Sequence, residues 1–233
     1  MLKIGHRGYA AVAPENSEAS FKEALKRKVD MIEFDVRLTK DDKLVIFHDS
    51  TLERICGEKE RVIDLTLKDL KKYDIGSWYS PEYFQERVMT LQELINLVGT
   101  KADYNIEVKI EGSERDSAVI KLINLIEKEG IIDKVVVTSF DFKFLKHLKE
   151  AQSSIKTGII LEEDIEEWEK IIEYTGADGM SINYEIISEE VVAEAKKKGY
   201  FVYVWTVNNK YAVNGLRKMK VDGIISDDPS ILK

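Results

Sequence analysis

Short runs of β-branched and apolar residues recur along the chain and alternate with amphipathic stretches of helical periodicity. Eight runs predict strands, at residues 3–6, 31–38, 104–110, 134–139, 156–161, 179–183, 201–206 and 223–226. The stretches between them predict helices at residues 17–28, 113–129, 141–150, 165–174, 188–198 and 208–219. Several of these helices begin on Ser, Asp or Asn, and Thr90 with Glu93 has the spacing of a capping box. The repeated βα alternation predicts an α/β fold, a closed (β/α)8 TIM barrel.

An internal echo supports repeated units. Residues 177–181 (ADGMS) and 221–225 (VDGII) match one another at two predicted strand starts. No linker divides the 233 residues, so we expect a single domain over residues 1–233.

The βα rhythm breaks at about residues 50–89, where no simple crossover helix is predicted. This stretch carries the aromatic residues Tyr73, Trp78, Tyr79, Tyr83 and Phe84. We interpret it as a small insertion after the second strand, on a βα loop. Barrel enzymes build their sites on these loops, so the insertion is expected to overhang the site and influence substrate choice. The alternative is a stabilising lobe without ligand contact.

Composition excludes several classes of protein. A net charge of -8 argues against a nucleic-acid binder. With 33% charged and 44% hydrophobic residues, the chain has the balance of a globular protein. We expect neither a membrane span nor an export signal. The single cysteine, Cys56, excludes an intramolecular disulfide and fits a cytoplasmic location. It is expected to be an inert thiol.

Glu33 and Asp35 stand two residues apart in one predicted strand, so their side chains share a face with Cα atoms about 6–7 Å apart. Two ionised carboxylates at that range repel by roughly 2–3 kcal/mol at an effective dielectric of about 20. A proton on one carboxylate or a bound cation would offset the repulsion. Glu107, inward-facing on the next barrel strand, adds a third carboxylate and favours a hard divalent cation, Mg²⁺, Ca²⁺ or Mn²⁺. The alternative is a buried ion-pair cluster with Arg37 and Lys109.

Two of the three histidines are predicted to meet these carboxylates. The turn at residues 40–43 predicts a hairpin, and pairing Lys40 with Lys43 would set His48 beside Asp35. His6 ends the first predicted strand, at the same rim of the barrel. Two imidazoles near a metal can serve as general acid and general base at neutral pH.

Fixed positive charge accompanies the histidines. Arg7 and Lys109 suit a phosphate, and Gly8 would let the backbone turn sharply after Arg7. Neither a Walker loop nor a Rossmann fingerprint is present in the sequence. His147 lies in a predicted amphipathic helix and is expected to be a surface or packing residue.

The motifs together resemble those of the glycerophosphodiester phosphodiesterase family. The resemblance rests on His6-Arg7-Gly8, residues 14–17 (PENS), Glu33-Phe34-Asp35, residues 48–52 (HDSTL), Glu107-Val108-Lys109 and residues 222–229 (DGIISDDP). Residues 62–67 (VIDLTL) and 76–78 (GSW) are similar to that family's insertion. Met89 departs from the pattern, because the family usually has proline there.

The resemblance implies a TIM barrel that cleaves a glycerophosphodiester into glycerol 3-phosphate and an alcohol. It implies that one divalent cation is held by Glu33, Asp35 and Glu107. It further implies that His6 and His48 form the acid/base pair.

The remaining roles also come from the resemblance. Arg7 and Lys109 would bind the phosphate, Trp205 on an inward strand position would approach the substrate, and Glu15 would support the rim. A lysophospholipid substrate and a phosphodiester-binding barrel without activity are the alternatives. The oligomeric state, including a homodimer, is left open.

Overall fold

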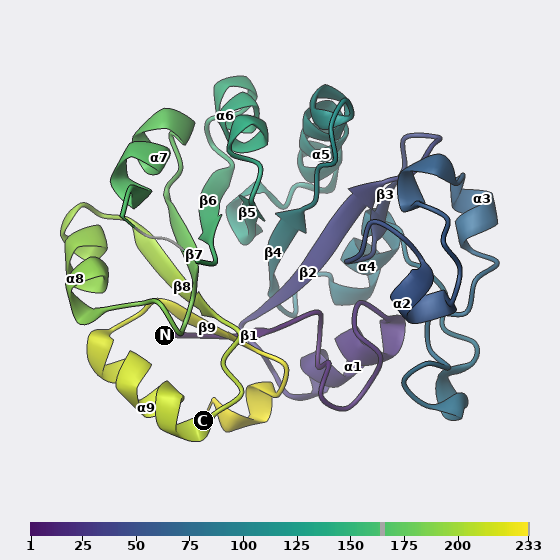
Figure 1. Ribbon diagram of the computed structural model, residues 1–233, viewed down its shortest axis with the longest axis horizontal. Helices are drawn as coiled ribbons and strands as arrows, with labels where there is room; N and C mark the ends of the chain where they lie inside the picture. The colour runs from purple at the N-terminus through teal and green to yellow at the C-terminus, as the bar shows by residue number, and fades with distance from the viewer. Residues whose placement is uncertain (164–165, 233) are drawn as a thin grey trace.

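The computed structural model describes residues 1–163 and 166–232, and its centre is a closed barrel of parallel strands (Figure 1). The barrel strands are β1 (Leu2–Gly5), β2 (Met31–Leu38), β4 (Asp103–Val108), β5 (Val135–Ser139), β6 (Lys156–Leu161), β7 (Gly179–Asn183), β8 (Phe201–Trp205) and β9 (Gly223–Ser226). Each pairs in parallel with its neighbour, and β1 pairs with both β2 and β9, which closes the ring. The predicted (β/α)8 TIM barrel is confirmed.

Helices surround the strands, as Figure 1 shows. They are α1 (Glu18–Lys26), α4 (Leu91–Val98), α5 (Arg115–Glu129), α6 (Phe142–Ala151), α7 (Trp168–Thr175), α8 (Glu189–Lys197) and α9 (Lys210–Met219). Polar N-caps begin most of them, and the capping box of Thr90 and Glu93 at α4 is confirmed. The predicted start of one helix at residue 165 lies outside the described residues.

Strand alternation separates two layers of side chains. On β2, Ile32, Phe34 and Val36 face outward into the core between strands and helices, as predicted. The opposite face of the strands points into the barrel, where Met31 packs with Tyr203 and others at the bottom. Apolar side chains thus fill the lower interior, and polar ones are left for the mouth.

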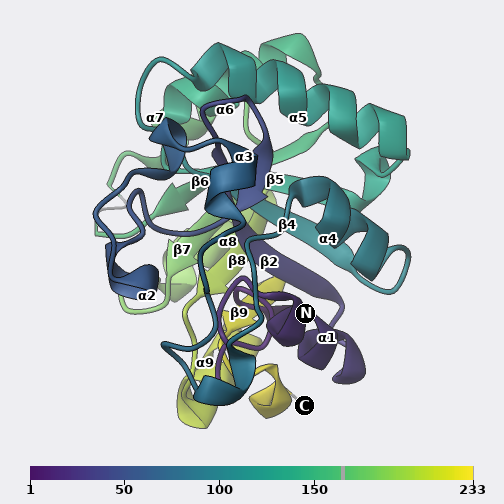
Figure 2. The ribbon, with the colours of Figure 1, turned by 90° about the vertical axis from the view of Figure 1, so that its right-hand side faces the viewer.

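The insertion folds around a small core of its own. It contains the short helices α2 (Glu53–Cys56) and α3 (Leu67–Leu70) and 3-10 turns at Val62–Asp64 and Pro81–Tyr83. Figure 2, which views the molecule from this side, shows α2 and α3 in front of the barrel strands. Its core consists of Val45, Phe47, Leu52, Ile55, Val62, Leu70, Ile75 and Val88. The insertion is therefore anchored on β3 (Leu44–Ile46) and the residue after it.

The two similar segments, residues 177–181 and 221–225, form the same structural arrangement, an aspartate just before a strand. Asp178 accepts a hydrogen bond from the backbone N–H of Thr157 at 2.8 Å and pairs with Lys149. Asp222 accepts from the N–H of Val202 at 2.9 Å and also pairs with a lysine. Each aspartate thus ties the start of its own strand to the preceding strand.

The predicted hairpin register is wrong by one residue. Strand β3 is antiparallel to β2, but Thr39, not Lys40, stands opposite Lys43, and the Thr39 N–H donates to the Lys43 carbonyl at 3.0 Å. The reason is a three-residue turn that ends on Asp42, whose φ of 56° is left-handed. The Asp35 carbonyl consequently accepts from Phe47 and not from His48.

Within the described residues, none of the helices combines the length and the apolar character that crossing a membrane requires.

Candidate active site

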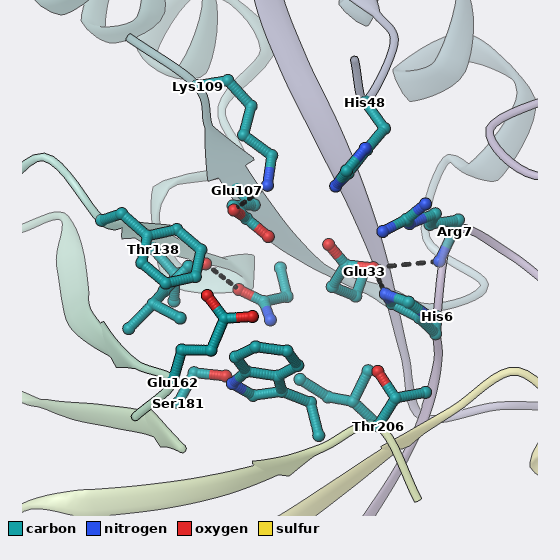
Figure 3. A pocket seen from close by; sticks show the side chains of 15 residues that line it. His6, Arg7, Glu33, His48, Glu107, Lys109, Thr138, Glu162, Ser181 and Thr206 are labelled. Carbon is teal, nitrogen blue, oxygen red and sulfur yellow. Dashed lines mark hydrogen bonds and ion pairs between the residues drawn. The ribbon is translucent and has the colours of Figure 1, made fainter. Parts of the chain in front are cut away.

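A cavity of about 380 Å³ opens at the carboxyl ends of the barrel strands (Figure 3). Of the residues predicted from the sequence, it is lined by His6, Arg7, Glu33, His48, Glu107, Lys109 and Trp205. Asp35 and Glu15 do not line the cavity but contact Arg7, which does. The structure thus brings together every predicted site residue.

Three carboxylates converge beside the cavity, and two of them, Glu33 and Glu107, line it. Parallel pairing of β2 with β4 places Asp35 beside Glu107 and Glu33 beside Asn105. Glu33, Asp35 and Glu107 each offer one oxygen, and the three oxygens lie within 4.8 Å of one another. Glu33 is 3% exposed and Asp35 is 1% exposed.

The pKa values of the three carboxyl groups are shifted in different directions. Burial raises the pKa of Glu33 to about 8, a shift that His6 opposes and that Asp35 and Glu107 reinforce. Burial also raises the pKa of Glu107. Asp35 is desolvated too, but Lys109 and Arg7 hold its pKa well below the usual range. Without a cation, the cluster therefore relieves its repulsion by keeping a proton on Glu33.

The same cluster fits a hard divalent cation. Glu33 Oε1 is buried without a hydrogen-bond partner, and an unsatisfied buried oxygen needs a compensating group. The buried Asp35 Oδ1 is met by the Lys109 ammonium at 3.2 Å. The donor set is all carboxylate oxygen, which suits Mg²⁺, Ca²⁺ or Mn²⁺ better than zinc.

The alternative ion-pair cluster forms only in part. Lys109 Nζ lies 3.2 Å from Asp35 Oδ1 and also contacts Glu107. Arg37 does not join them, because it pairs with Glu111 and donates to the His48 carbonyl at 2.8 Å. Arg7 Nε also lies 3.4 Å from Asp35 Oδ2, but Arg7 is shared with Glu15. Two cationic side chains thus face three carboxylates of the cluster and Glu15.

Both histidines of the site are held at Nδ1 by an aspartate. His6 Nδ1 lies 2.6 Å from Asp227 Oδ1, and His48 Nδ1 lies 2.6 Å from Asp49 Oδ1. Figure 3 shows the rings of His6 and His48 pointing toward the carboxylates. A hydrogen bond at Nδ1 fixes the ring and leaves Nε2 for the site.

The environments of the two imidazoles differ. Burial acts to lower the pKa of His6, but the hydrogen bond to Asp227 and the Glu33 charge raise it above its ordinary value. Burial lowers the pKa of His48, and Asp35 offsets this only in part. The third histidine, His147, is exposed on α6, as predicted.

The turn after β1 places Arg7 against the carboxylates. The Arg7 N–H donates to Glu33 Oε2 at 2.9 Å, and its Nη1 donates to Glu15 Oε1 at 2.7 Å. Gly8 follows with φ of +89°, and a Cβ there would lie 2.5 Å from Ser20 Oγ. The predicted need for glycine after Arg7 is confirmed.

Aromatic side chains form part of the cavity wall. Trp205 faces inward from the end of β8, and its ring meets Phe140 edge to face at 6.3 Å. Lys109 Nζ lies 5.5 Å from the centre of the Phe140 ring. The indole N–H of Trp205 is buried without a partner.

Sequence reasoning missed several residues of the site. Asp227 belongs to the motif at residues 222–229, but the sequence pattern does not indicate its contact with His6. The pattern also does not indicate that Asp49 holds the neighbouring His48. The cavity is also lined by Thr138, Phe140, Glu162, Ser181 and Thr206. Thr138, Phe140, Glu162 and Thr206 stand near or just beyond the carboxyl ends of predicted strands, which was the available signal. Ser181 lies in the middle of its strand.

The insertion reaches the site. A second cavity of about 510 Å³ shares His48 and Lys109 with the first and continues along Ser50, Thr51 and Arg54. The lobe is therefore in contact with the site and is more than a distant stabilising element.

Carboxylates, two histidines and two cationic side chains at the mouth of a TIM barrel are groups that suit the cleavage of a phosphodiester. Residues 6–231 match the Glycerophosphoryl diester phosphodiesterase family, and the chain belongs to this family.

Relatives and solved structures agree with this assignment. A glycerophosphodiester phosphodiesterase of Caldanaerobacter subterraneus is 35% identical over 234 residues, covering 99% of this chain and 96% of the relative. One from Bacillus subtilis is 30% identical over 99% of this chain and 85% of the relative. A phosphodiesterase of Oleispira antarctica, solved with its product sn-glycerol-3-phosphate, superposes with a TM-score of 0.93. The two sequences are 28% identical, and the superposition covers 98% of this chain and 95% of the Oleispira antarctica chain. The chain is thus a glycerophosphodiester phosphodiesterase, a hydrolase.

Proposed function

We propose that the protein hydrolyses glycerophosphodiesters to glycerol 3-phosphate and an alcohol, with the aid of one divalent cation and two histidines. The observation that carries the proposal is the trio of carboxylate oxygens within 4.8 Å of one another, flanked by His6 and His48. The product-bound structure of the Oleispira antarctica phosphodiesterase supports glycerol 3-phosphate as the product.

Glu33, Asp35 and Glu107 would hold the cation, Mg²⁺ or Ca²⁺ with Mn²⁺ as a third candidate. The buried Glu33 Oε1, which has no hydrogen-bond partner, supports this assignment. When bound, the cation polarises the phosphoryl group.

Arg7 and Lys109 bind the phosphate and stabilise the negative charge that builds up on it. Their half-buried side chains, which line the cavity beside the carboxylates, support this role. Trp205 lies against the substrate on the cavity wall. Glu15 holds the Arg7 guanidinium at the rim.

His6 and His48 act as the acid/base pair. One removes the proton from the attacking hydroxyl, and the other protonates the departing alkoxide. Attack by water gives glycerol 3-phosphate directly, whereas attack by the adjacent glycerol hydroxyl gives a cyclic phosphate that water must then open. Their aspartate partners at Nδ1 support both roles, because they turn Nε2 toward the site. His6 Nε2 lies 3.8 Å from Glu33 Oε2 there.

The experiment is a product assay for glycerol 3-phosphate across choline, ethanolamine, glycerol and inositol headgroups. Protein stripped by a chelator is compared with protein returned to Mg²⁺, Ca²⁺ or Mn²⁺. We expect turnover only with a restored cation. Equal turnover by stripped protein would contradict the metal assignment, and the absence of glycerol 3-phosphate would contradict the reaction.

A lysophospholipid is a second candidate substrate, favoured by one observation. The insertion exposes Trp78, Tyr79 and Phe84, the last to 55%, and such aromatics suit a lipid interface. Turnover of micellar lysophosphatidylcholine, compared with glycerophosphocholine, separates the two candidates. A higher kcat/KM for headgroup release from lysophosphatidylcholine than from glycerophosphocholine would favour the lipid substrate.

We further propose a reducing, cytoplasmic location. The lone Cys56 supports it, because its half-buried thiol, hydrogen-bonded to the Asp74 carbonyl, has no cysteine with which to pair.

A further inference from the structure

Arg54, in the short helix α2 of the insertion, forms two forked ion pairs. Its Nη2 and Nη1 donate to the two Glu15 oxygens at 2.7 and 3.0 Å. Its Nε and Nη2 donate to the two Asp49 oxygens at 2.7 and 3.1 Å. One guanidinium thus joins two carboxylates that are distant in sequence.

Each of these carboxylates holds a side chain of the site. Glu15 Oε1 also accepts from Arg7 Nη1, and Asp49 Oδ1 also meets His48 Nδ1. The five groups form one row with Arg54 at the centre. Arg7, Glu15, Arg54 and Asp49 alternate in charge, and the His48 imidazole ends the row. Arg7 at one end is proposed to bind phosphate, and His48 at the other end is proposed to transfer a proton.

The backbone of Arg54 is held rigidly. Leu52 and Ile55, on either side of it, are 0% and 8% exposed and belong to the core of the insertion. The Trp78 ring lies 5.7 Å from the Arg54 guanidinium carbon, a cation–π contact. The insertion therefore holds the backbone of Arg54 through its core and the guanidinium through the Trp78 ring.

The geometry requires arginine in particular. Only a guanidinium presents enough donors in a planar fork to serve two carboxylates at once. Burial acts to raise the pKa of Glu15 and of Asp49, yet Arg54 helps to lower both. Both carboxylates therefore stay ionised and orient the groups beyond them.

We propose that Arg54 is a positioning residue that makes the insertion part of the catalytic apparatus. It sets the phosphate-binding guanidinium of Arg7 and the His48 imidazole at a fixed separation. The inference rests on the proposed function, since it takes the roles of Arg7 and His48 from there.

The test compares Arg54→Ala, Arg54→Lys and the unaltered protein with glycerophosphocholine and the restored cation. Groups that orient a ligand-binding side chain typically contribute about 10–100-fold. We expect Arg54→Ala to lose at least about tenfold in kcat, with its unfolding temperature close to that of the parent. Arg54→Lys, with a single point charge, should recover only part of the loss.

Chemical rescue separates positioning from a general structural effect. Millimolar guanidinium should restore part of the kcat of Arg54→Ala, because it refills the vacated fork between Glu15 and Asp49. It should restore nothing in Arg54→Ala/Asp49→Ala, where one side of the fork is missing. Equal concentrations of NaCl serve as the salt control.

Arg87→Ala is the matched control. Arg87 lies in the same insertion and, within the described residues, donates to the Phe84 and Glu86 carbonyls and not to Glu15 or Asp49. It should keep the parental kcat.

Three results would overturn the proposal. These are a parental kcat in Arg54→Ala, a lost kcat that guanidinium leaves unchanged, and an equal loss in Arg87→Ala. If the parent itself releases no glycerol 3-phosphate, the proposed function fails first, which keeps the two failures distinguishable.

Discussion

His6 and Asp227 stand 221 positions apart in the chain, yet their side chains meet at 2.6 Å. The contact exists because β1 pairs with β9 and closes the barrel, and the His6 N–H donates to the Ser226 carbonyl at 2.9 Å. Asp227 also accepts from Asn208 Nδ2 at 2.6 Å, which fixes the carboxylate. Closure of the sheet thus brings Asp227 to His6, and Asp227 orients the imidazole.

Replacing Asp227 by Asn should lower kcat by about 10–100-fold. An amide can hold the imidazole in the wrong tautomer, and it no longer stabilises the imidazolium. Because Asp227 helps to raise the pKa of His6, its loss should move the limb of the rate profile set by His6 to lower pH. Steady-state assays of kcat/KM from pH 5 to about 9 test this. An unchanged profile would contradict the proposed role of Asp227.

Strand alternation was sufficient to predict the carboxylate cluster. Glu33 and Asp35 must share a face of β2, and an inward Glu107 at the matching level of β4 meets them whenever the strands pair in parallel. That argument needs only the side-chain period of a strand. The barrel follows from the same kind of local evidence, repeated along the chain.

Other features depend on information that the local pattern lacks. The hairpin register turned on the left-handed backbone of Asp42 and on the Thr39 hydroxyl, which accepts from the Lys43 N–H at 3.0 Å. The contact of His6 with Asp227 depends on barrel closure. The fork of Arg54 depends on how the insertion packs. Each of these is a tertiary relationship between segments, which neither propensity nor periodicity encodes.

Affinity for the proposed cation should depend on pH. With a pKa of about 8, Glu33 keeps its proton at neutral pH in the metal-free protein, so a cation must displace that proton. Below about pH 8 the affinity should fall by about tenfold per pH unit. Calorimetry of Mg²⁺ or Ca²⁺ binding in buffers of different ionisation enthalpy measures both the affinity and the proton released. An affinity that is constant from pH 6 to about 8 would contradict proton displacement.

Gly8→Ala should destabilise the protein more than Gly57→Ala. Both glycines have left-handed backbones, with φ of +89° and +76°, so both substitutions carry a conformational cost of about 1–2 kcal/mol. Only at Gly8 would the new Cβ also lie 2.5 Å from Ser20 Oγ, whereas nothing lies within 4 Å of it at Gly57. The clash should add about 1–3 kcal/mol. Urea denaturation of both variants measures the difference, and equal losses would show that the clash is relieved without cost.

His6→Ala and His48→Ala should each lose at least about a hundredfold in kcat while remaining folded. Both rings lie in the cavity with Nδ1 held by an aspartate, so truncation removes a proton-transfer group and leaves the barrel strands intact. His147→Ala is the control, since the His147 side chain is exposed on α6 and lies beside Asp116. Glycerol 3-phosphate release and circular dichroism, measured on all three variants, distinguish lost chemistry from lost fold. Near-parental turnover in either site variant would remove that histidine from the mechanism.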